Sequence, residues 1–190
     1  MVRANLNDKK LVTAILSGSF NNNKSVNYLL PQDGRRSERL QKFMEYSFDV
    51  CHHFGDVFLS DDRKGCALIL LPDKKKTTIQ SILFDVKFIF QSIGLSNVKK
   101  AISRESEIKK YHPKDPLYYL WFIGVNKNEQ GKGIGSKLLA EVIEQGKKQN
   151  RTVCLETSTV KNLPWYKKFG FEIYKELDFG YTLYCMKLLS

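Results

Sequence analysis

Hydrophobic residues in the first 110 positions recur three and four apart, which is the spacing of one face of a helix. This pattern predicts helices over residues 8–17, 37–54, 77–92 and 96–111. Ser37 is expected to cap the second helix, because a serine side chain there can accept a backbone hydrogen bond. Two short apolar runs, 56–60 and 66–71, flank a polar turn and predict an antiparallel hairpin.

The second half of the chain has a different pattern. Leu117–Val125 (LYYLWFIGV) carries no charge and is rich in aromatic and branched side chains, so it predicts a central strand buried on both faces. A glycine-rich turn, a helix over 134–149, a strand over 153–157, a short helix over 162–169 and two closing strands over 171–179 and 181–188 follow. This order predicts a mixed α/β sheet flanked by helices.

Composition narrows the class of protein. With 190 residues and 42% hydrophobic content the chain can bury a core as one domain, and it is neither disordered nor low in complexity. No apolar run approaches the roughly 18 residues of a membrane-spanning helix, and the N-terminus lacks the apolar stretch of a secretory signal. Four cysteines without metal-ligand spacing favour reduced, buried thiols in a cytoplasmic protein without a metal site.

The net charge of +11 attracts polyanions, but its basic residues are spread along the chain. No zinc-finger, KH or RNP-type signature accompanies the charge. We therefore expect a solvated lysine-rich surface rather than a nucleic-acid-binding patch.

The segment Gln130–Ser136 (QGKGIGS) joins the predicted central strand to a helix. Its three glycines permit backbone conformations and close approach that a Cβ atom would prevent. The first N–H groups of the helix have no partner within the helix, and the helix dipole favours a negative charge there. The segment therefore predicts a site for a phosphate or pyrophosphate. Its spacing differs from that of the P-loop and of the dinucleotide-binding loop.

Gln130–Gly135 resembles the Q/R-x-x-G-x-G/A loop of the GNAT superfamily of N-acetyltransferases, which grips the pyrophosphate of acetyl-CoA. Downstream, Asn162, Tyr166 and the sequence Phe169-Gly170-Phe171 resemble the second signature of the family. The resemblance implies an α+β fold with a GNAT-like mixed, mostly antiparallel central sheet flanked by helices. It further implies one domain over residues 1–190, in which 1–116 shape the acceptor side and 117–190 form the acetyl-CoA-binding core.

The resemblance also implies roles for particular residues. Tyr166 would be the general acid that protonates the departing thiolate. The expected acetyl-CoA-binding residues are Ile123, Gly124, Val125, Gln130, Gly131, Lys132, Gly133, Ile134, Gly135, Ser136 and Asn162. Glu156 is the candidate general base, with His112, Asp115 and an ordered water as alternatives. Gly124 is equally interpreted as a packing glycine, and Asn162 as a helix cap.

The resemblance therefore implies an enzyme that moves the acetyl group of acetyl-CoA to a primary amine by direct attack. Cys154 could in principle carry the acyl group, but a buried thiol without a paired histidine is the better interpretation. The acceptor is expected to be a small molecule rather than a protein, without a membrane or nucleic-acid partner. The alternatives are a catalytically silent GNAT-like protein that binds CoA or nucleic acid, and an unrelated basic α/β protein that binds RNA.

Overall fold

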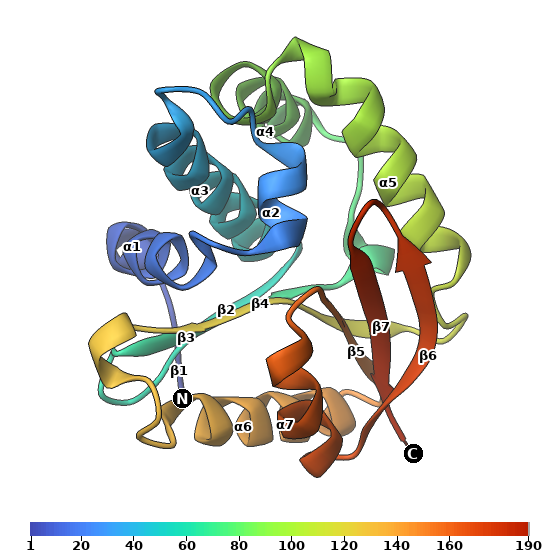
Figure 1. The fold of residues 1–190 in the computed structure, drawn as a ribbon. Coiled ribbons are helices and arrows are strands. Elements are labelled where there is room, and N and C mark those ends of the chain that lie inside the picture. Colours follow the sequence, from blue (N-terminus) through green and yellow to red (C-terminus); the bar gives the residue numbers. More distant parts are fainter. Residues whose placement is uncertain (190) are drawn as a thin grey trace.

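The computed structural model describes residues 1–189 of the chain. A seven-stranded sheet with the strand order β1-β2-β3-β4-β5-β7-β6 runs through the molecule. Helices α6 and α7 cover one face, and α1 to α5 lie over the other face (Figure 1). All neighbouring strands are antiparallel except β4 and β5, which are parallel. The predicted mixed, mostly antiparallel sheet flanked by helices is therefore confirmed.

The strands follow the predicted apolar runs within one or two residues. They are β1 (Val2–Arg3), β2 (Gly55–Leu59), β3 (Gly65–Leu70), β4 (Leu117–Val125), β5 (Thr152–Thr157), β6 (Phe171–Asp178) and β7 (Thr182–Leu188). The predicted hairpin is confirmed, because β2 and β3 pair antiparallel from Gly55 with Leu70 to Leu59 with Cys66. Only β1 was not predicted, since two residues are too few to form a hydrophobic pattern.

The helices also follow the predicted periodicity. They are α1 (Lys9–Phe20), α2 (Lys24–Leu29), α3 (Arg36–Phe54), α4 (Ile79–Phe88), α5 (Val98–Lys110), α6 (Ile134–Lys148) and α7 (Leu163–Lys168), and a π-helical turn, Ile89–Ile93, extends α4. The prediction that Ser37 caps α3 is wrong. The helix begins one residue earlier, and the Asp33 side chain accepts the N–H of Arg35 at 3.0 Å instead. Helix α2 has only six residues and was missed.

The prediction that β4 is buried on both faces is also wrong in part. Tyr118 and Leu120 are buried against α6, whereas Tyr119 and Trp121, on the other face of the strand, are half-buried. Their face of the strand borders a cavity beneath α4 and α5. An uncharged run reports the apolar character of both faces, but it does not distinguish a packed core from an apolar cavity wall.

The two parallel strands at the centre separate soon after they meet. β4 and β5 pair only from Leu117 with Thr152 to Tyr119 with Cys154. On its other side, β4 bulges at Trp121, because Ile69 pairs with Leu120 and Leu68 pairs with Phe122. The remainder of β4 therefore leaves the edge that faces β5 without a strand partner, and a wedge opens between the two strands.

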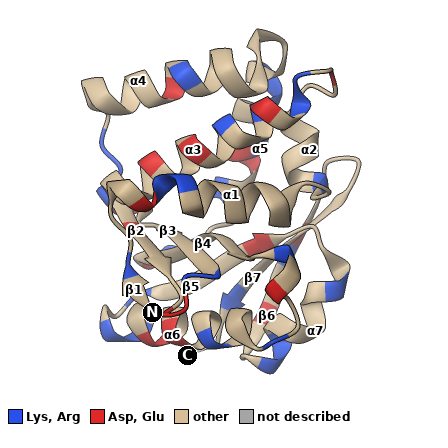
Figure 2. Cartoon of the chain, turned by 90° about the vertical axis from the view of Figure 1, so that its left-hand side faces the viewer, with Lys and Arg blue, Asp and Glu red and all other residues tan. Residues whose placement is uncertain are grey.

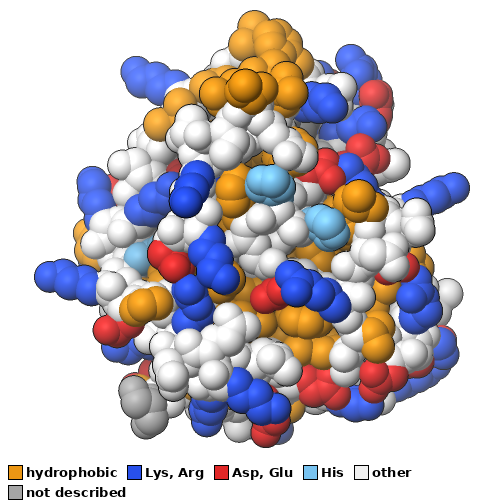
Figure 3. All heavy atoms as spheres, turned by 180° about the vertical axis from the view of Figure 1, so that it is seen from behind, with side chains coloured by type: hydrophobic (Ala, Val, Ile, Leu, Met, Phe, Trp, Pro, Cys, Tyr) orange, Lys and Arg blue, Asp and Glu red, His pale blue; other side chains and the backbone are white. Residues whose placement is uncertain are grey.

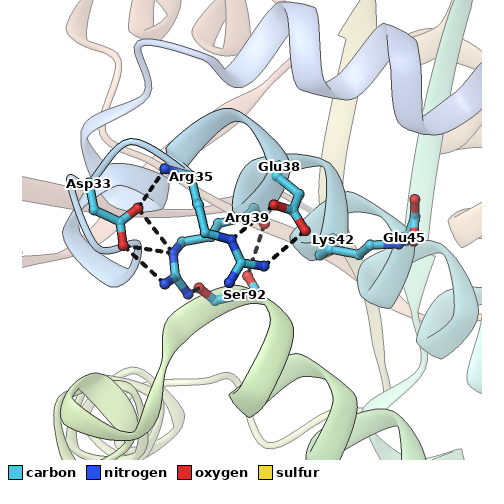
Figure 4. A network of polar contacts seen from close by, with 7 residues as sticks. All are labelled: Asp33, Arg35, Glu38, Arg39, Lys42, Glu45 and Ser92. Atoms are coloured by element: carbon cyan, nitrogen blue, oxygen red, sulfur yellow. Dashed lines mark hydrogen bonds and ion pairs between the residues drawn. The ribbon is translucent and has the colours of Figure 1, made fainter.

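Polar contacts tie helix α3 to the π-helical turn that extends α4 (Figure 4). Arg39 on α3 forms an ion pair with Asp33 at 3.0 Å and donates to the carbonyl oxygen of Ser92 at 3.2 Å. The buried Ser92 hydroxyl donates back to the carbonyl oxygen of Arg39 at 3.1 Å. These reciprocal bonds fix the end of the α4 segment to α3, so the upper wall of the cavity is held in place.

The outer side of α4 is apolar and exposed. Its large side chains Ile79, Ile82, Leu83 and Val86 face outward, and Phe90 of the following π-helical turn joins them. Figure 3 shows hydrophobic side chains gathered at the end of the molecule where α4 lies. Residues 77–92 therefore carry hydrophobic side chains on two sides of the helix, one that packs toward α3 and one that is exposed.

Basic residues do not gather into one stripe on the face shown in Figure 2. Lysines and arginines lie at several elements of that face with acidic residues between them. Most arginines have a carboxylate partner, as in the pairs Arg3–Asp56, Arg63–Asp8 and Arg151–Asp73. The arrangement agrees with the expectation of a dispersed, solvated charge.

Tyr118 offers a test of the packing between β4 and α6. Its side chain is fully buried, and its hydroxyl finds no hydrogen-bond partner among residues 1–189. Because a buried hydroxyl without a partner costs free energy, Tyr118→Phe is expected to raise the free energy of unfolding by about 1 kcal/mol. Tyr46→Phe is the control, since the Tyr46 hydroxyl donates to Asp85 at 2.8 Å, and its loss should lower stability. Urea denaturation measures both, and a destabilised Tyr118→Phe variant would contradict the expectation.

Candidate functional site

One cavity of about 1380 Å³ follows the wedge between β4 and β5. At one end it meets the glycine-rich loop that precedes α6, and at the other it extends beneath α4 and α5. Residues from both halves of the chain therefore line the same space. Of the predicted acetyl-CoA-binding residues, those on its wall are Ile123, Gly124, Val125, Gln130, Gly131, Gly133, Ile134, Gly135, Ser136 and Asn162, and Lys132 is not among them.

The loop before α6 has the backbone that the glycines were expected to permit. Gly131 and Gly133 have φ angles of +80° and +83°, in the left-handed region that other residues rarely adopt. Gly133 occupies the N-cap position of α6. The first helical hydrogen bond runs from the N–H of Lys137 to the Gly133 carbonyl oxygen at 3.0 Å. The N–H groups of residues 134–136 precede that bond, so they are the free donors at the positive end of the helix.

Side chains around this loop hold it in place. Gln130 donates from Nε2 to the carbonyl oxygen of Val125 at 3.2 Å, which connects the loop to the end of β4. Lys132 and Lys64 both lie 3.1 Å from the same Glu129 oxygen, and the bonds from Lys132 and Lys64 hold the pKa of the Glu129 carboxyl below its ordinary value. The charge of Lys132 is therefore partly offset, which leaves the backbone N–H groups as the main candidate donors for an anion at the loop.

Trp165 was not singled out by the sequence, although it adjoins Tyr166. Its indole Nε1 donates to Ser136 Oγ at 3.0 Å, and its ring lies 3.7 Å from where a Cβ on Gly135 would stand. The first turn of α6 is thereby joined to α7. Ser136 therefore accepts a hydrogen bond from Trp165 and also lines the cavity wall.

Gly124 has a packing reason to be glycine. A Cβ atom at this position would lie 3.0 Å from Leu16 Cδ2 and 3.1 Å from Ser19 Oγ on helix α1. Ser19 also donates to the carbonyl oxygen of Val125 at 2.9 Å. The glycine therefore lets α1 pack closely on the end of β4, which agrees with the packing interpretation, while the residue still borders the cavity.

Asn162 and Tyr166 meet the same cavity from α7. Asn162 occupies the cap position of the helix, but its side chain makes no capping hydrogen bond. Tyr166 is 5% exposed, and its hydroxyl forms no hydrogen bond within the described part of the chain. Burial raises the pKa of Tyr166 well above that of a free tyrosine, so its phenol holds its proton and is available as a donor.

Glu156 is the centre of a buried polar cluster on the opposite side of the wedge. Its side chain is 5% exposed; one oxygen lies 3.1 Å from His112 Nε2, and the other accepts the Tyr119 hydroxyl. Burial and the Glu156 charge raise the pKa of Tyr119, which keeps this phenol a donor. Glu156 and Tyr119 border the cavity, whereas His112 stands behind Glu156 and the exposed Asp115 lies apart from it.

The four cysteines are free and buried. Burial raises the pKa of the Cys154 thiol well above its ordinary value, which opposes formation of the nucleophilic thiolate.

His52 and His53 pack against Phe48 and Phe54. Across residues 1–189, no group of three His, Cys, Asp or Glu side chains is placed to hold a metal ion. No helix there is long and apolar enough to cross a membrane.

Part of the chain is similar in sequence to known acetyltransferases. Residues 100–173 match the family model of the acetyltransferase (GNAT) domain. An uncharacterized N-acetyltransferase of Schizosaccharomyces pombe is 37% identical over 57 residues, which are 30% of this chain and 23% of that protein. The chain spans less than a quarter of the length of this protein and of a probable serine/threonine-protein kinase of Dictyostelium discoideum that it also matches.

Solved structures resemble the whole chain at low sequence identity. A protein described as histone acetyltransferase HPA2 and related acetyltransferase, from Corynebacterium glutamicum, has a TM-score of 0.70 and 18% identity, with 100% of this chain and 95% of that chain covered. Arylalkylamine N-acetyltransferase 2 from Aedes aegypti has a TM-score of 0.66 and 16% identity, with coverages of 99% and 97%. Residues 100–173 therefore match a GNAT acetyltransferase domain, and the chain as a whole has the fold of the GNAT acetyltransferases.

Proposed function

We propose that this chain transfers the acetyl group of acetyl-CoA to a primary amine by direct attack in a ternary complex. The observation that carries the proposal is the wedge between β4 and β5, which joins the glycine-rich loop to Tyr166 on one side and Glu156 on the other. The GNAT family match supports acetyl transfer as the general chemistry. The S. pombe relative is named as an N-acetyltransferase, which supports an amine as the acceptor.

The loop fits the diphosphate of acetyl-CoA. Backbone N–H groups at the start of a helix bind phosphate oxygens well, and the left-handed Gly133 leads the loop into that start. A Cβ on Gly131 or Gly133 would meet no atom of the described chain within 4 Å, so the space beside these residues is open. Beyond the loop, the unpaired edge of β4 offers backbone groups to an extended pantetheine arm along the wedge.

The reaction needs a polarised carbonyl, a neutral amine and a proton for the leaving group. In the proposed step a bond forms between the amine nitrogen and the carbonyl carbon, and the carbon–sulfur bond breaks. One amine proton passes to Glu156, directly or through a water, and Tyr166 gives its proton to the departing sulfur. A backbone N–H of β4 near Ile123–Val125 would stabilise the charge on the carbonyl oxygen.

The proposal also covers the class of acceptor, the division of the domain and the location of the protein. The acceptor is proposed to be a small amine, because the acceptor end of the cavity lies beneath α4 and α5 rather than on an open surface. Residues 1–116 would form that end and residues 117–190 the acetyl-CoA side of one domain. The protein is proposed to act in the cytoplasm, where its four free cysteines stay reduced.

The experiment mixes the purified protein with acetyl-CoA and a panel of amines and measures release of free CoA thiol. Amine-dependent thiol release supports the proposed function. Calorimetry with desulfo-CoA, which lacks the thioester, measures cofactor binding separately. Binding without turnover on any amine would favour the catalytically silent alternative, and the absence of any binding would overturn both.

Glu156→Gln tests the general base. Glutamine keeps the size of the side chain and can still accept the Tyr119 hydrogen bond, but it cannot take a proton. We expect kcat to fall by about a hundredfold, while the Kd for acetyl-CoA stays unchanged. Glu172→Gln, at an exposed position of β6, is the matched control and should retain full activity. A Glu156→Gln variant as fast as the wild type would assign the proton transfer to His112, Asp115 or an ordered water.

A further inference from the structure

Arg104 stands out among the arginines of the chain. It lies on α5 and borders the cavity, with its guanidinium held between three elements. Its Nη2 donates to Ser25 Oγ of α2 at 2.6 Å, and its Nε donates to the Tyr181 hydroxyl, in the turn between β6 and β7, at 3.0 Å. Its terminal carbon lies 5.7 Å from the centre of the Phe179 ring. The side chain is therefore fixed by neutral groups.

The other arginines that border buried regions have carboxylate partners. Arg39 pairs with Asp33 and Arg151 pairs with Asp73, and both of these guanidinium groups are largely buried. Arg104 has no such ion pair with any carboxylate of residues 1–189, and its Nη1 makes no hydrogen bond there. A guanidinium removed from water without a counter-charge is costly, and its planar array of donors matches a carboxylate. The arrangement leaves a preorganised anion-binding group on the cavity wall.

Arg104 belongs to the same end of the cavity as the candidate base. Burial opposes the protonated guanidinium, but the contact with Tyr181 and the charge of Glu156 outweigh burial and raise the pKa of Arg104. Glu156 forms no ion pair with Arg104, and its two oxygens contact His112 and Tyr119 instead. A molecule whose negative group binds Arg104 would therefore share the cavity with Glu156.

We propose that the acceptor is an amine that also carries a carboxylate, with the carboxylate bound by Arg104 and the amine directed toward Glu156. This inference rests on the proposed function and names its substrate class. In this arrangement the anionic group of the acceptor replaces the missing counter-charge of Arg104. The amine then lies next to the group that takes its proton. Arg104 acts as a specificity-determining residue and takes no part in proton transfer.

The test uses acceptors in pairs that differ only by the carboxylate, such as tyrosine with tyramine and phenylalanine with phenethylamine. For the wild type, kcat/KM is expected to be at least about a hundredfold higher for the carboxylate member of the preferred pair. Arg104→Gln should remove that preference by lowering kcat/KM for the carboxylate member. Arg104→Lys keeps the positive charge and should recover part of the preference.

Two controls separate recognition from folding and from the proposed function. Arg36 is also bonded to neutral oxygens, those of Asn21 and Asn27, but it lies outside the cavity, so Arg36→Gln should leave the preference intact. Calorimetry with CoA and N-acetylated products, paired in the same way, measures recognition without turnover. Tighter binding of the carboxylate product by the wild type, lost in Arg104→Gln, supports the inference even if no amine is turned over.

The outcomes are distinct. Transfer to amines with no preference for the carboxylate member, or a preference that survives in Arg104→Gln, would overturn the role of Arg104 and leave the proposed function standing. The same conclusion follows if both N-acetylated products bind equally. Absence of transfer to every amine, together with carboxylate-selective product binding, would overturn the proposed activity and leave the Arg104 site.

Discussion

A Gly133→Val variant is expected to bind acetyl-CoA about a hundredfold more weakly than the wild-type chain. Gly133 has a φ of +83°, and a β-branched residue resists this left-handed conformation. A Cβ here would meet no protein atom within 4 Å, so the expected effect is a change of backbone conformation rather than a clash within the chain. The change redirects the N–H groups that open α6, which are the donors proposed for the diphosphate.

Gly180 provides a matched control for this variant. It has a φ of +78° and equally open space around it, but it lies in the turn between β6 and β7, away from the loop. Gly180→Val should therefore impose a similar backbone strain and a similar loss of thermal stability, with the Kd for acetyl-CoA unchanged. Calorimetry measures the Kd, and thermal unfolding with and without acetyl-CoA measures the stabilisation by ligand. Equal effects of the two variants on Kd would mean that the loop does not bind the diphosphate.

The second large effect is expected for Tyr166→Phe, in which kcat falls by about a hundredfold to ten-thousandfold. The variant keeps the buried ring, which packs against Trp165 and Phe171, and removes only the hydroxyl oxygen. Because no described group accepts a hydrogen bond from this hydroxyl, its loss should leave stability and the Kd for acetyl-CoA nearly unchanged. Stopped-flow or steady-state thiol release measures the rate.

Tyr118→Phe is the control for this experiment, since it deletes another buried hydroxyl without a partner at a position outside the cavity. It should retain the wild-type kcat.

The raised pKa of Tyr166 also gives a pH dependence. A tyrosine with a raised pKa stays protonated at every pH below its ordinary value of about 10, so the wild type should show no loss of rate from Tyr166 ionisation in that range. Unchanged turnover by Tyr166→Phe at every pH would assign the proton donor to another group.

Much of the fold could be predicted because its elements are locally encoded. Helices α3 and α6 carry an apolar face at helical spacing, and the β2–β3 hairpin has two apolar runs around a polar turn. The elements that were missed, β1 and α2, are too short to repeat a pattern. The error at Ser37 concerns a helix boundary: Asp33 accepts the N–H of Arg35, and the helix begins at Arg36, ahead of the serine.

The glycine-rich loop was also predictable, because the left-handed conformations of Gly131 and Gly133 are properties of the residues themselves. Lys132 was assigned to the anion site because of its charge and its place in the glycine-rich motif. In the structure, it faces Glu129 beside Lys64, a residue 68 positions away whose approach only the fold decides. The sequence left Gly124 as either an acetyl-CoA-binding residue or a packing glycine. The close contact of α1 with β4 supports the packing role.

The sequence by itself determined the helices, the strands and the glycine-rich start of α6, since these depend on the side-chain period and on the backbone freedom of neighbouring residues. Only the tertiary structure decided which polar groups share the cavity. Glu156 meets Tyr119 across the opening between β4 and β5, and Arg104 meets Ser25 and Tyr181 from opposite ends of the chain. Contacts between such distant residues follow from how the sheet separates and how helices cover it, and no local pattern records that geometry.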